Sequence, residues 1–293
     1  MPSITSVGIV AKSHLQAATP SLVDVERWLA DHRVEAVFET ATAALMPPNA
    51  KRRVADKPSL VSSVGLVLVL GGDGTLLNMA DCIGRAGVNV PILGVNFGSL
   101  GFLTEVTLPE LYPALEAALA GHAHIEERLT LNATIARSNG APITEIAVND
   151  VVINKGARSR LIDLEISVGD GLVTTVRADG LIIATPTGST AYNLAAGGPI
   201  VQPNVDALVL TPIAPHTLTN RPIVIPASSS VRVKPIVDER DEVFVTFDGQ
   251  TGAELHAGNE ISVCRGREPM RLIRPATRSY FEVLREKLNW GKR

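Results

Sequence analysis

The segment GGDGT, residues 71–75, places a carboxylate among glycines, between an apolar run and a helix-like stretch. Glycines between a strand and a helix expose backbone N–H groups and a helix N-terminus, and this arrangement binds anions such as phosphate. A carboxylate should repel that anion, so Asp73 needs a further role. It can help to hold Mg²⁺, or it can accept the proton of a hydroxyl group that attacks phosphorus. Either role favours phosphoryl transfer to an alcohol.

The GGDGT segment matches neither of two common phosphate-binding fingerprints. It lacks the GxxxxGK[ST] of a P-loop, and Leu77 occupies the last glycine position of GxGxxG. A tight turn with an aspartate cap at the start of a helix is the simpler interpretation. Three glycines around one acid exceed what a cap needs, so we favour a functional loop.

A second cluster of polar residues lies at residues 179–200, in DGLIIATPTGSTAYNLAAGGPI. A strand is predicted to end at Pro186, hydroxyl residues then gather around Gly188, and a short helix follows. Hydroxyls and N–H groups at a helix start suit ribose or phosphate oxygens. An ordinary polar loop with a helix cap is the alternative.

Two smaller signals are Asn149-Asp150, inside the apolar run IAVNDVVI, and Asp248-Gly249-Gln250, after the strand-like VFVTF. A buried polar pair costs stability unless it forms hydrogen bonds. A turn or bulge explains the first pair as often as a ligand does, and a hairpin turn is the default interpretation of the second.

The elements that position these residues fall into two groups. Strand-like and helix-like segments alternate over about the first 120 residues, which predicts a doubly wound parallel α/β sheet. Ten short β-rich segments separated by turns follow, which predicts a mostly antiparallel β domain.

The chain closes with a helix at 277–290, expected to pack back on the first domain. The predicted domains are 1–123, joined by the C-terminal helix region 270–293, and 124–269. The predicted strands of the first domain are 7–11, 36–38, 65–70 and 90–96, and its helices are 21–32, 76–87 and 109–122.

Composition excludes several classes of protein. The chain has 293 residues, of which 45% are hydrophobic, 19% charged and 4% aromatic, as expected for a soluble α/β protein. A net charge of −3 argues against a nucleic-acid partner. No apolar stretch approaches the roughly 18 residues of a membrane span. The N-terminus does not resemble a signal peptide, and the two distant cysteines lack CxxC spacing, so we expect a cytoplasmic protein.

These motifs together resemble the NAD kinases, in the same order over nearly the whole chain. GGDGT alone is shared with diacylglycerol-type and sphingosine-type lipid kinases and, more loosely, with phosphofructokinases. The TPTGSTAY block and the order of motifs make the NAD kinases much the closest family. The motifs are GGDGT at 71–75, NxGxLGFL at 96–103, ND at 149–150, DGLIIATPTGSTAY at 179–192, HTLTNRPIV at 216–224 and DGQ at 248–250.

The resemblance implies ATP-dependent phosphorylation of the 2′-hydroxyl of the adenosine ribose of NAD, which gives NADP. It also implies a divalent metal, with Mg²⁺ expected, and a homo-oligomer, a dimer or tetramer, with its site at a subunit interface. Asp73 matches the proton acceptor of the family, with Gly74 beside it. The positions that match NAD contacts are Asn149, Asp150, Arg160, Arg177, Asp179, Thr190, Ala191, Tyr192, Asn193, Leu194, Ala195 and Gln250.

The chain departs from the family pattern at two positions. Ala195 stands where the family often has Ser, so a hydroxyl contact is lost there, and Asn78 stands where a basic residue is common. Arg177 resembles the subgroup that prefers NAD over NADH.

Two alternatives remain. A lipid or sugar kinase that shares GGDGT would need an apolar or small-sugar acceptor pocket, whereas the hydroxyl-rich loop at 185–192 suits a polar acceptor. A non-catalytic dinucleotide-binding regulator would gain nothing from Asp73.

Overall fold

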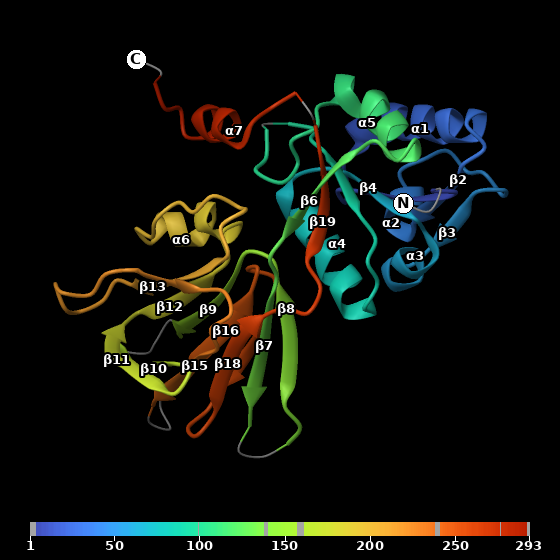
Figure 1. Cartoon of the computed structure of the whole chain (residues 1–293). Coiled ribbons are helices and arrows are strands. Elements are labelled where there is room, and N and C mark those ends of the chain that lie inside the picture. Colours follow the sequence, from blue (N-terminus) through green and yellow to red (C-terminus); the bar gives the residue numbers. More distant parts are fainter. Residues whose placement is uncertain are drawn as a thin grey trace. The chain divides into compact units, whose positions relative to one another are not determined.

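The computed structural model describes residues 4–98, 100–137, 140–156, 161–237, 241–275 and 277–291. The chain divides into two compact units (Figure 1). The first unit comprises Met1–Glu127 and Met270–Arg293, and the second comprises Arg128–Pro269. The sequence-based division at 123/124 and 269/270 differs from this one at the first boundary.

The first unit is built on a sheet of seven strands in the order β3-β2-β1-β4-β5-β19-β6. Strand β1 pairs in parallel with β2 and β4, and β5 pairs in parallel with β4 and β19. Every residue of β4 is buried, which is typical of a parallel strand covered on both faces. The strands are β1 (Ser6–Ala11), β2 (Glu35–Glu39), β3 (Arg53–Ala55), β4 (Leu66–Leu70), β5 (Ile92–Val95), β6 (His124–Arg128) and β19 (Met270–Arg274).

Helices cover both faces of this sheet (Figure 1). Apolar residues of α1 and α5 join one core with alternate residues of β1 and β4, such as Ile9 and Leu68. On the other face, Leu60 of α3 packs over Gly8, and Leu76 of α4 packs over Gly94. The predicted doubly wound parallel sheet is therefore confirmed. The helices are η1 (Gln16–Ala18), α1 (Thr19–Asp31), α2 (Thr40–Ala43), α3 (Lys57–Ser63), α4 (Asp73–Ala86), η2 (Leu108–Glu110), α5 (Leu111–Leu119) and α7 (Tyr280–Lys287).

The C-terminal region returns to the first unit as a strand and a helix. Residues 270–274, which the sequence analysis grouped with a terminal helix, form β19 beside β5. Helix α7 is shorter than the predicted 277–290, because a capping box of Ser279 and Glu282 starts it at Tyr280. The C-terminal helix thus belongs to the first unit, as expected.

The second unit contains two six-stranded sheets, in the orders β11-β10-β15-β18-β7-β8 and β14-β13-β12-β9-β16-β17. Residues from both sheets, such as Leu164 and Leu181, share one hydrophobic core. The predicted antiparallel β domain is confirmed. The elements are β7 (Leu131–Ala136), β8 (Ile143–Ala147), β9 (Asp150–Lys155), β10 (Ile162–Val168), β11 (Gly171–Ala178), β12 (Gly180–Ala184), η3 (Gly188–Thr190), α6 (Tyr192–Ala195), β13 (Ala207–Ile213), β14 (Ile223–Pro226), β15 (Val231–Ile236), β16 (Val243–Phe247), β17 (Thr251–Leu255) and β18 (Glu260–Arg265).

The stretch 143–154, which contains the apolar run IAVNDVVI, is divided at Val148 and Asn149. Its first part, β8, belongs to one sheet, and its second part, β9, belongs to the other. The backbone leaves the first ladder here because the N–H groups of both residues bond to a side chain, Asp248, instead of to a neighbouring strand.

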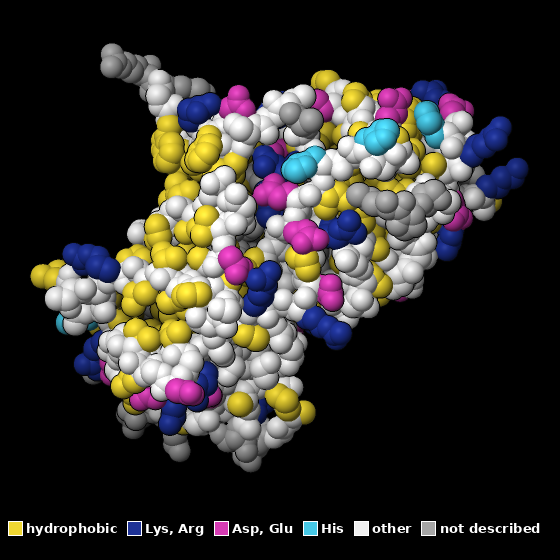
Figure 2. Space-filling model, viewed as in Figure 1, with side chains coloured by type: hydrophobic (Ala, Val, Ile, Leu, Met, Phe, Trp, Pro, Cys, Tyr) yellow, Lys and Arg dark blue, Asp and Glu magenta, His cyan; other side chains and the backbone are white. Residues whose placement is uncertain are grey.

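The surface shows charges of both signs. On the face in Figure 2, Lys and Arg side chains are dispersed among acidic and polar ones. Among the described residues, no helix is both long enough and apolar enough to cross a membrane.

Candidate active site

Asp73 is the first residue of α4, at the edge of the first sheet where β4 ends. Gly72 caps the helix in an extended conformation, with φ −107° and ψ −178°, which lets the helix begin three residues before the predicted Leu76. The N–H of Gly71 donates to the carbonyl of Val95, at the end of the neighbouring strand β5. The turn between β4 and α4 is therefore tied to the end of β5.

The Asp73 carboxylate accepts four hydrogen bonds from one loop. Its Oδ2 accepts the N–H of Phe102 at 2.8 Å. Its Oδ1 accepts the N–H groups of Leu103 and Thr104, at 3.1 and 2.9 Å, and the Thr104 hydroxyl at 2.9 Å. These four donors fix the position of the carboxylate at the edge of the sheet.

Gly101 is required for this contact. A Cβ at this position would lie 2.1 Å from Asp73 Oδ1 and 2.3 Å from Thr104 Oγ1. The N–H of Gly101 also donates to the Thr104 carbonyl, which closes the loop into a turn. The LGFL residues of the motif at 96–103 therefore pack directly on Asp73.

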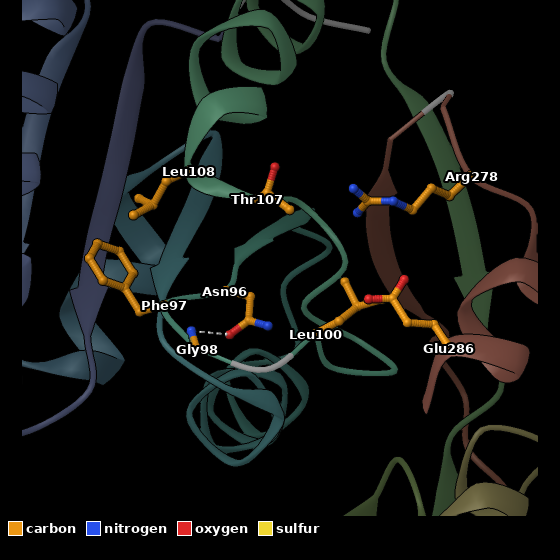
Figure 3. Close-up of a pocket in the computed structure, with 8 residues that line it drawn as sticks. All are labelled: Asn96, Phe97, Gly98, Leu100, Thr107, Leu108, Arg278 and Glu286. Atoms are coloured by element: carbon orange, nitrogen blue, oxygen red, sulfur yellow. Dashed lines mark hydrogen bonds between the residues drawn. The ribbon is translucent and has the colours of Figure 1, made fainter. Parts of the chain in front are cut away.

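Two cavities border this region within the first unit. One, of about 230 Å³, is lined by the first two glycines of the GGDGT segment and by the lysine that follows β1. Its residues are Lys12, Leu15, Gly71, Gly72, Asn96, Phe97 and Gly98. The other cavity, of about 290 Å³, is also lined by Asn96, Phe97 and Gly98 (Figure 3). Its remaining lining residues are Leu100, Thr107, Leu108, Arg278 and Glu286.

In the second unit, Asp248 holds the Asn149-Asp150 segment. Its Oδ1 accepts the N–H groups of Asn149 and Asp150, at 2.7 and 3.1 Å, and Oδ2 accepts that of Val148 at 2.9 Å. Asp248 and Gly249 both have left-handed backbones, with φ 51° and 67°, in the tight turn between β16 and β17. The expected hairpin turn at 248–250 is confirmed.

Asp150 is nearly inaccessible to solvent, with 4% of its surface exposed. Burial, and then the negative charge of Asp248, raise the pKa of Asp150 to about 7. At neutral pH this carboxyl group is therefore divided between its neutral and its charged form.

The 185–190 segment lies against Asn149. The Thr185 N–H donates to the Asn149 carbonyl at 2.9 Å, and the Thr185 hydroxyl donates to the Val148 carbonyl at 2.6 Å. The Ser189 hydroxyl donates to the Pro186 carbonyl at 2.6 Å. The two buried hydroxyls, Thr185 and Ser189, thus build the turn, as in the ordinary polar loop that the sequence analysis kept as the alternative to a ligand site.

Residues 190–195 follow this turn. Tyr192 is 43% exposed and Ala195 is exposed, whereas Asn193 is fully buried. The Asn193 amide group donates to the carbonyls of Ser189 and Pro199, and its oxygen accepts the Thr211 hydroxyl. This side chain stabilises the unit from inside, and a contact of Asn193 with NAD stays a prediction, as do those of Thr190, Ala191, Leu194 and the exposed Gln250.

Arg177 and Asp179 lie elsewhere in the second unit. Asp179 precedes β12 and pairs with Lys155 at 3.5 Å, whereas Thr185 follows the same strand. Arg177 pairs with Asp163, also at 3.5 Å. Five residues of strand separate the two groups by roughly 16 Å. Within one unit, the predicted NAD contacts therefore form two groups at opposite ends of β12. Arg160 lies outside the described residues.

Comparisons with known proteins decide the family. Residues 7–123 match the ATP-NAD kinase N-terminal domain, and residues 148–275 match the ATP-NAD kinase C-terminal domain. The chain belongs to the NAD kinase family. The NAD kinases of Geobacter sp. strain M21 and of Geobacter metallireducens are 44% and 45% identical to it, each over 98% of this chain and 99% of the relative.

Two solved structures of NAD(H) kinases are similar to the chain. Yeast NADH kinase complexed with NADH has a TM-score of 0.91 at 27% identity, over 100% of this chain and 90% of that one. An NAD kinase from Archaeoglobus fulgidus in complex with ATP has a TM-score of 0.76 over 96% and 99%; at 24% identity it supports the fold alone.

Membership of the NAD kinase family confirms several predictions. The chain is a kinase, and its activity is ATP-dependent phosphorylation of NAD to NADP. The lipid or sugar kinase and the non-catalytic regulator are thereby set aside.

Three residues beside these loops have contacts or positions that the sequence analysis did not assign to them. Lys12 follows the buried strand 7–11, so the expected parallel sheet already placed it at the same edge as Asp73. Asp248 was treated as a turn residue, although Asp-Gly after a strand resembles the GGDGT signal. Thr104 gave no local signal, because its partner lies 31 residues away.

Proposed function

We propose that the chain transfers phosphate to the 2′-hydroxyl of the adenosine ribose of NAD, with Asp73 as the proton acceptor. The observation that carries this proposal is the asymmetry of the carboxylate. Oδ1 accepts three hydrogen bonds, whereas Oδ2 accepts a single N–H, from Phe102, among the contacts that the structure records. Oδ2 therefore has capacity to accept a further hydrogen bond, from a substrate hydroxyl. Gly74, next in the first turn of α4, is exposed and leaves room for a substrate.

ATP is proposed to bind with its phosphates in the cavity lined by Gly71 and Gly72. The positive end of α4 favours an anion there, and the ammonium group of Lys12 supplies a full positive charge. Mg²⁺ is proposed to bind between these phosphates and a carboxylate, the usual arrangement for this ion. Among the described residues no three acidic, His or Cys side chains form a metal cluster.

NAD is proposed to contact Asn149 and Asp150, the loop 190–195 and Gln250, which belong to segments joined by hydrogen bonds in the second unit. Arg177 and Asp179, at the other end of β12, are proposed to serve the site of a neighbouring chain. A homo-oligomer in which two chains share each site follows. We also propose a cytoplasmic location, because Cys82 and Cys264 are free thiols.

The direct test is incubation of the pure protein with Mg-ATP and NAD, with a coupled enzymatic assay for NADP. Mixed oligomers of Asp73→Asn and Asp179→Asn chains test the shared site, since each mixed pair retains one intact set of residues. We expect partial recovery of activity. Verified mixed oligomers without any recovery would show that the site lies within one chain.

A further inference from the structure

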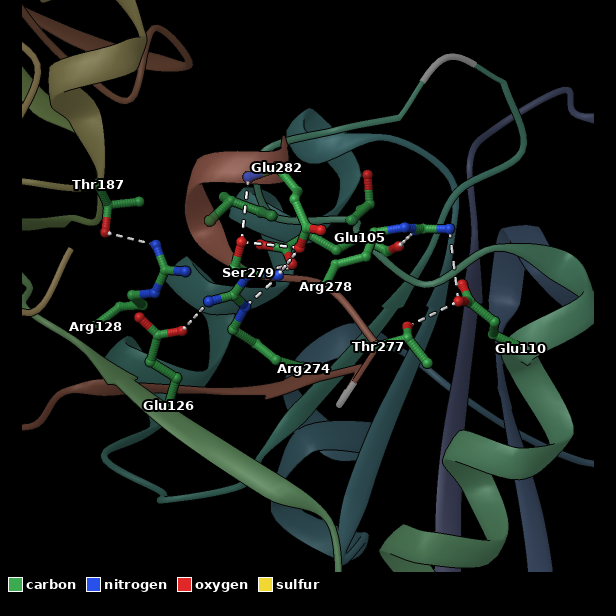
Figure 4. Close-up of polar contacts among 12 residues, drawn as sticks. Glu105, Glu110, Glu126, Arg128, Thr187, Arg274, Thr277, Arg278, Ser279 and Glu282 are labelled. Atoms are coloured by element: carbon green, nitrogen blue, oxygen red, sulfur yellow. Dashed lines mark hydrogen bonds and ion pairs between the residues drawn. The ribbon is translucent and has the colours of Figure 1, made fainter. Parts of the chain in front are cut away.

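The loop that binds Asp73 is itself held by the C-terminal segment of the chain. Thr104, which donates both its N–H and its hydroxyl to Asp73, is fully buried. The residue after it, Glu105, is 2% exposed and accepts two hydrogen bonds from Arg274 of β19, at 2.6 and 3.0 Å (Figure 4). Arg274 also pairs with Glu126 of β6 at 2.9 Å. A charged network therefore fixes the side chain of Glu105 from behind the loop.

A second arginine fixes the backbone of the same residue. Arg278 donates to the main-chain carbonyl of Glu105 at 2.8 Å, and it lies 3.5 Å from Glu110 (Figure 4). At the other end of the loop, the Lys287 ammonium group of α7 lies 5.7 Å from the centre of the Phe102 ring. Arg278 and Lys287 thus contact the two ends of the run of residues that donates to Asp73.

These contacts point to a role in catalysis. A carboxylate at the start of a helix can adopt several rotamers, and only some direct a free lone pair at a substrate. We propose that Thr104 is a positioning residue that orients the Asp73 carboxylate, and that Arg274 and Arg278 of the C-terminal segment hold the loop in the conformation that allows this. The inference rests on the proposed role of Asp73 as proton acceptor.

A double-mutant cycle tests Thr104. Thr104→Val keeps the shape of the side chain and removes the hydroxyl, so we expect kcat to fall on the order of ten-fold, with the KM values for NAD and ATP changed less than about two-fold. Thr104→Ser restores the hydroxyl and should recover most of kcat. In an Asp73→Asn background, Thr104→Val should lower kcat no further, because the two residues act as one unit.

A matched pair of arginine variants tests the C-terminal clamp. Arg278→Met removes the donor to the Glu105 carbonyl and keeps an apolar chain of similar length. Arg52→Met makes the same change at an arginine of the same unit that pairs with Glu26 of α1 at 2.8 Å. We expect kcat to fall roughly three- to ten-fold for Arg278→Met. Arg52→Met should lower the Tm and leave kcat unchanged.

The outcomes separate this inference from the proposed function. Wild-type kcat in Asp73→Asn would show that Asp73 is no proton acceptor, and both proposals would fall. A large loss in Asp73→Asn, together with an unchanged kcat in Thr104→Val, would leave the proposed function intact and overturn the positioning role. The positioning role is also overturned if Thr104→Val lowers kcat equally in the wild-type protein and in Asp73→Asn. The role of the arginines is overturned if Arg52→Met lowers kcat as much as Arg278→Met does.

Discussion

Each unit of the molecule contains one aspartate that binds three consecutive backbone N–H groups of another segment. Asp73 binds those of residues 102–104, and Asp248 binds those of residues 148–150. Both aspartates precede a glycine in an Asp-Gly step that follows a strand. The two sites differ in what lies next to the carboxylate. Asp73 has a hydroxyl beside it, from Thr104, whereas Asp248 has a second acid, Asp150.

The difference shows that a carboxylate held by a run of N–H groups is not in itself a sign of catalysis. Asp248 lies in a left-handed hairpin turn, and its charge adds to the effect of burial in raising the pKa of its neighbour Asp150. Asp73 lies at a helix N-terminus, and the two glycines before it line a cavity. We conclude that Asp248 mainly shapes the Asn149-Asp150 segment, whereas the surroundings of Asp73 suit a reacting group.

Asp73→Asn should have the largest effect on activity. The asparagine side chain keeps the size of the original and lacks its basicity, so kcat should fall at least about 10²-fold, which is about 3 kcal/mol of barrier. Its amide nitrogen would face the N–H of Phe102, and we expect a stability loss of about 1–2 kcal/mol. The coupled NADP assay and urea unfolding measure the two effects.

Two other outcomes for Asp73→Asn would change the interpretation. Recovery of activity by excess Mg²⁺, with weaker apparent metal affinity, would show that Asp73 acts mainly through the metal. Near-normal kcat with a lowered Tm would make Asp73 equivalent to Asp248, and the contrast between the units would disappear.

Asp150→Asn should change how stability depends on pH. The pKa of Asp150 is about 7 in the folded protein and about 3.9 in an unfolded chain. A raised pKa favours folding below the unfolded value, and that stability is lost as the pH rises through 7. Relative to Asp150→Asn, the wild-type protein should therefore lose about 2–3 kcal/mol between pH 5 and pH 8. Urea unfolding at several pH values measures this difference.

Asp248→Asn is the control for this effect. It removes the charge that faces Asp150 and keeps one oxygen to accept N–H groups, and asparagine tolerates the left-handed backbone. The pH dependence should become smaller, since burial remains as the main cause of the raised pKa. A dependence as steep as that of the wild-type protein would show that Asp248 does not act on Asp150.

The sequence predicted features that depend on neighbouring residues. The uniform apolar pattern of residues 66–70 predicted a buried parallel strand, and the glycines around Asp73 predicted its importance. Features set by distant residues could not be predicted in this way. The break at Val148 depends on Asp248, which lies 100 residues away, and the Arg274–Glu105 pair spans 169 residues. Hydroxyl residues at 185–190 were visible in the sequence, but only the fold shows that Thr185 and Ser189 are occupied internally.

Two glycine-to-alanine substitutions, each adding one methyl group, test whether the aspartate-bound segments of the two units have different roles. At Gly101 the new Cβ would meet side-chain oxygens of Asp73 and Thr104, at 2.1 and 2.3 Å. At Gly188 it would meet backbone atoms of Asn149, with the carbonyl oxygen at 2.0 Å. A side chain can rotate away, whereas a backbone must move together with the strand that it begins.

Gly101→Ala should therefore displace the Asp73 carboxylate and lower kcat by about ten-fold or more, with a stability loss of about 1 kcal/mol. Gly188→Ala should lower the free energy of unfolding by about 1–3 kcal/mol and raise the KM for NAD. Gly171→Ala is the control, because its Cβ would meet only the Val168 carbonyl, at 3.6 Å. If Gly101→Ala and Gly188→Ala lower the free energy of unfolding equally and have the same kcat, the loop at 101–104 has the same structural role as the 148–150 segment. A selective loss of kcat in Gly101→Ala supports the opposite conclusion, because the added methyl group acts there on the orientation of one carboxylate.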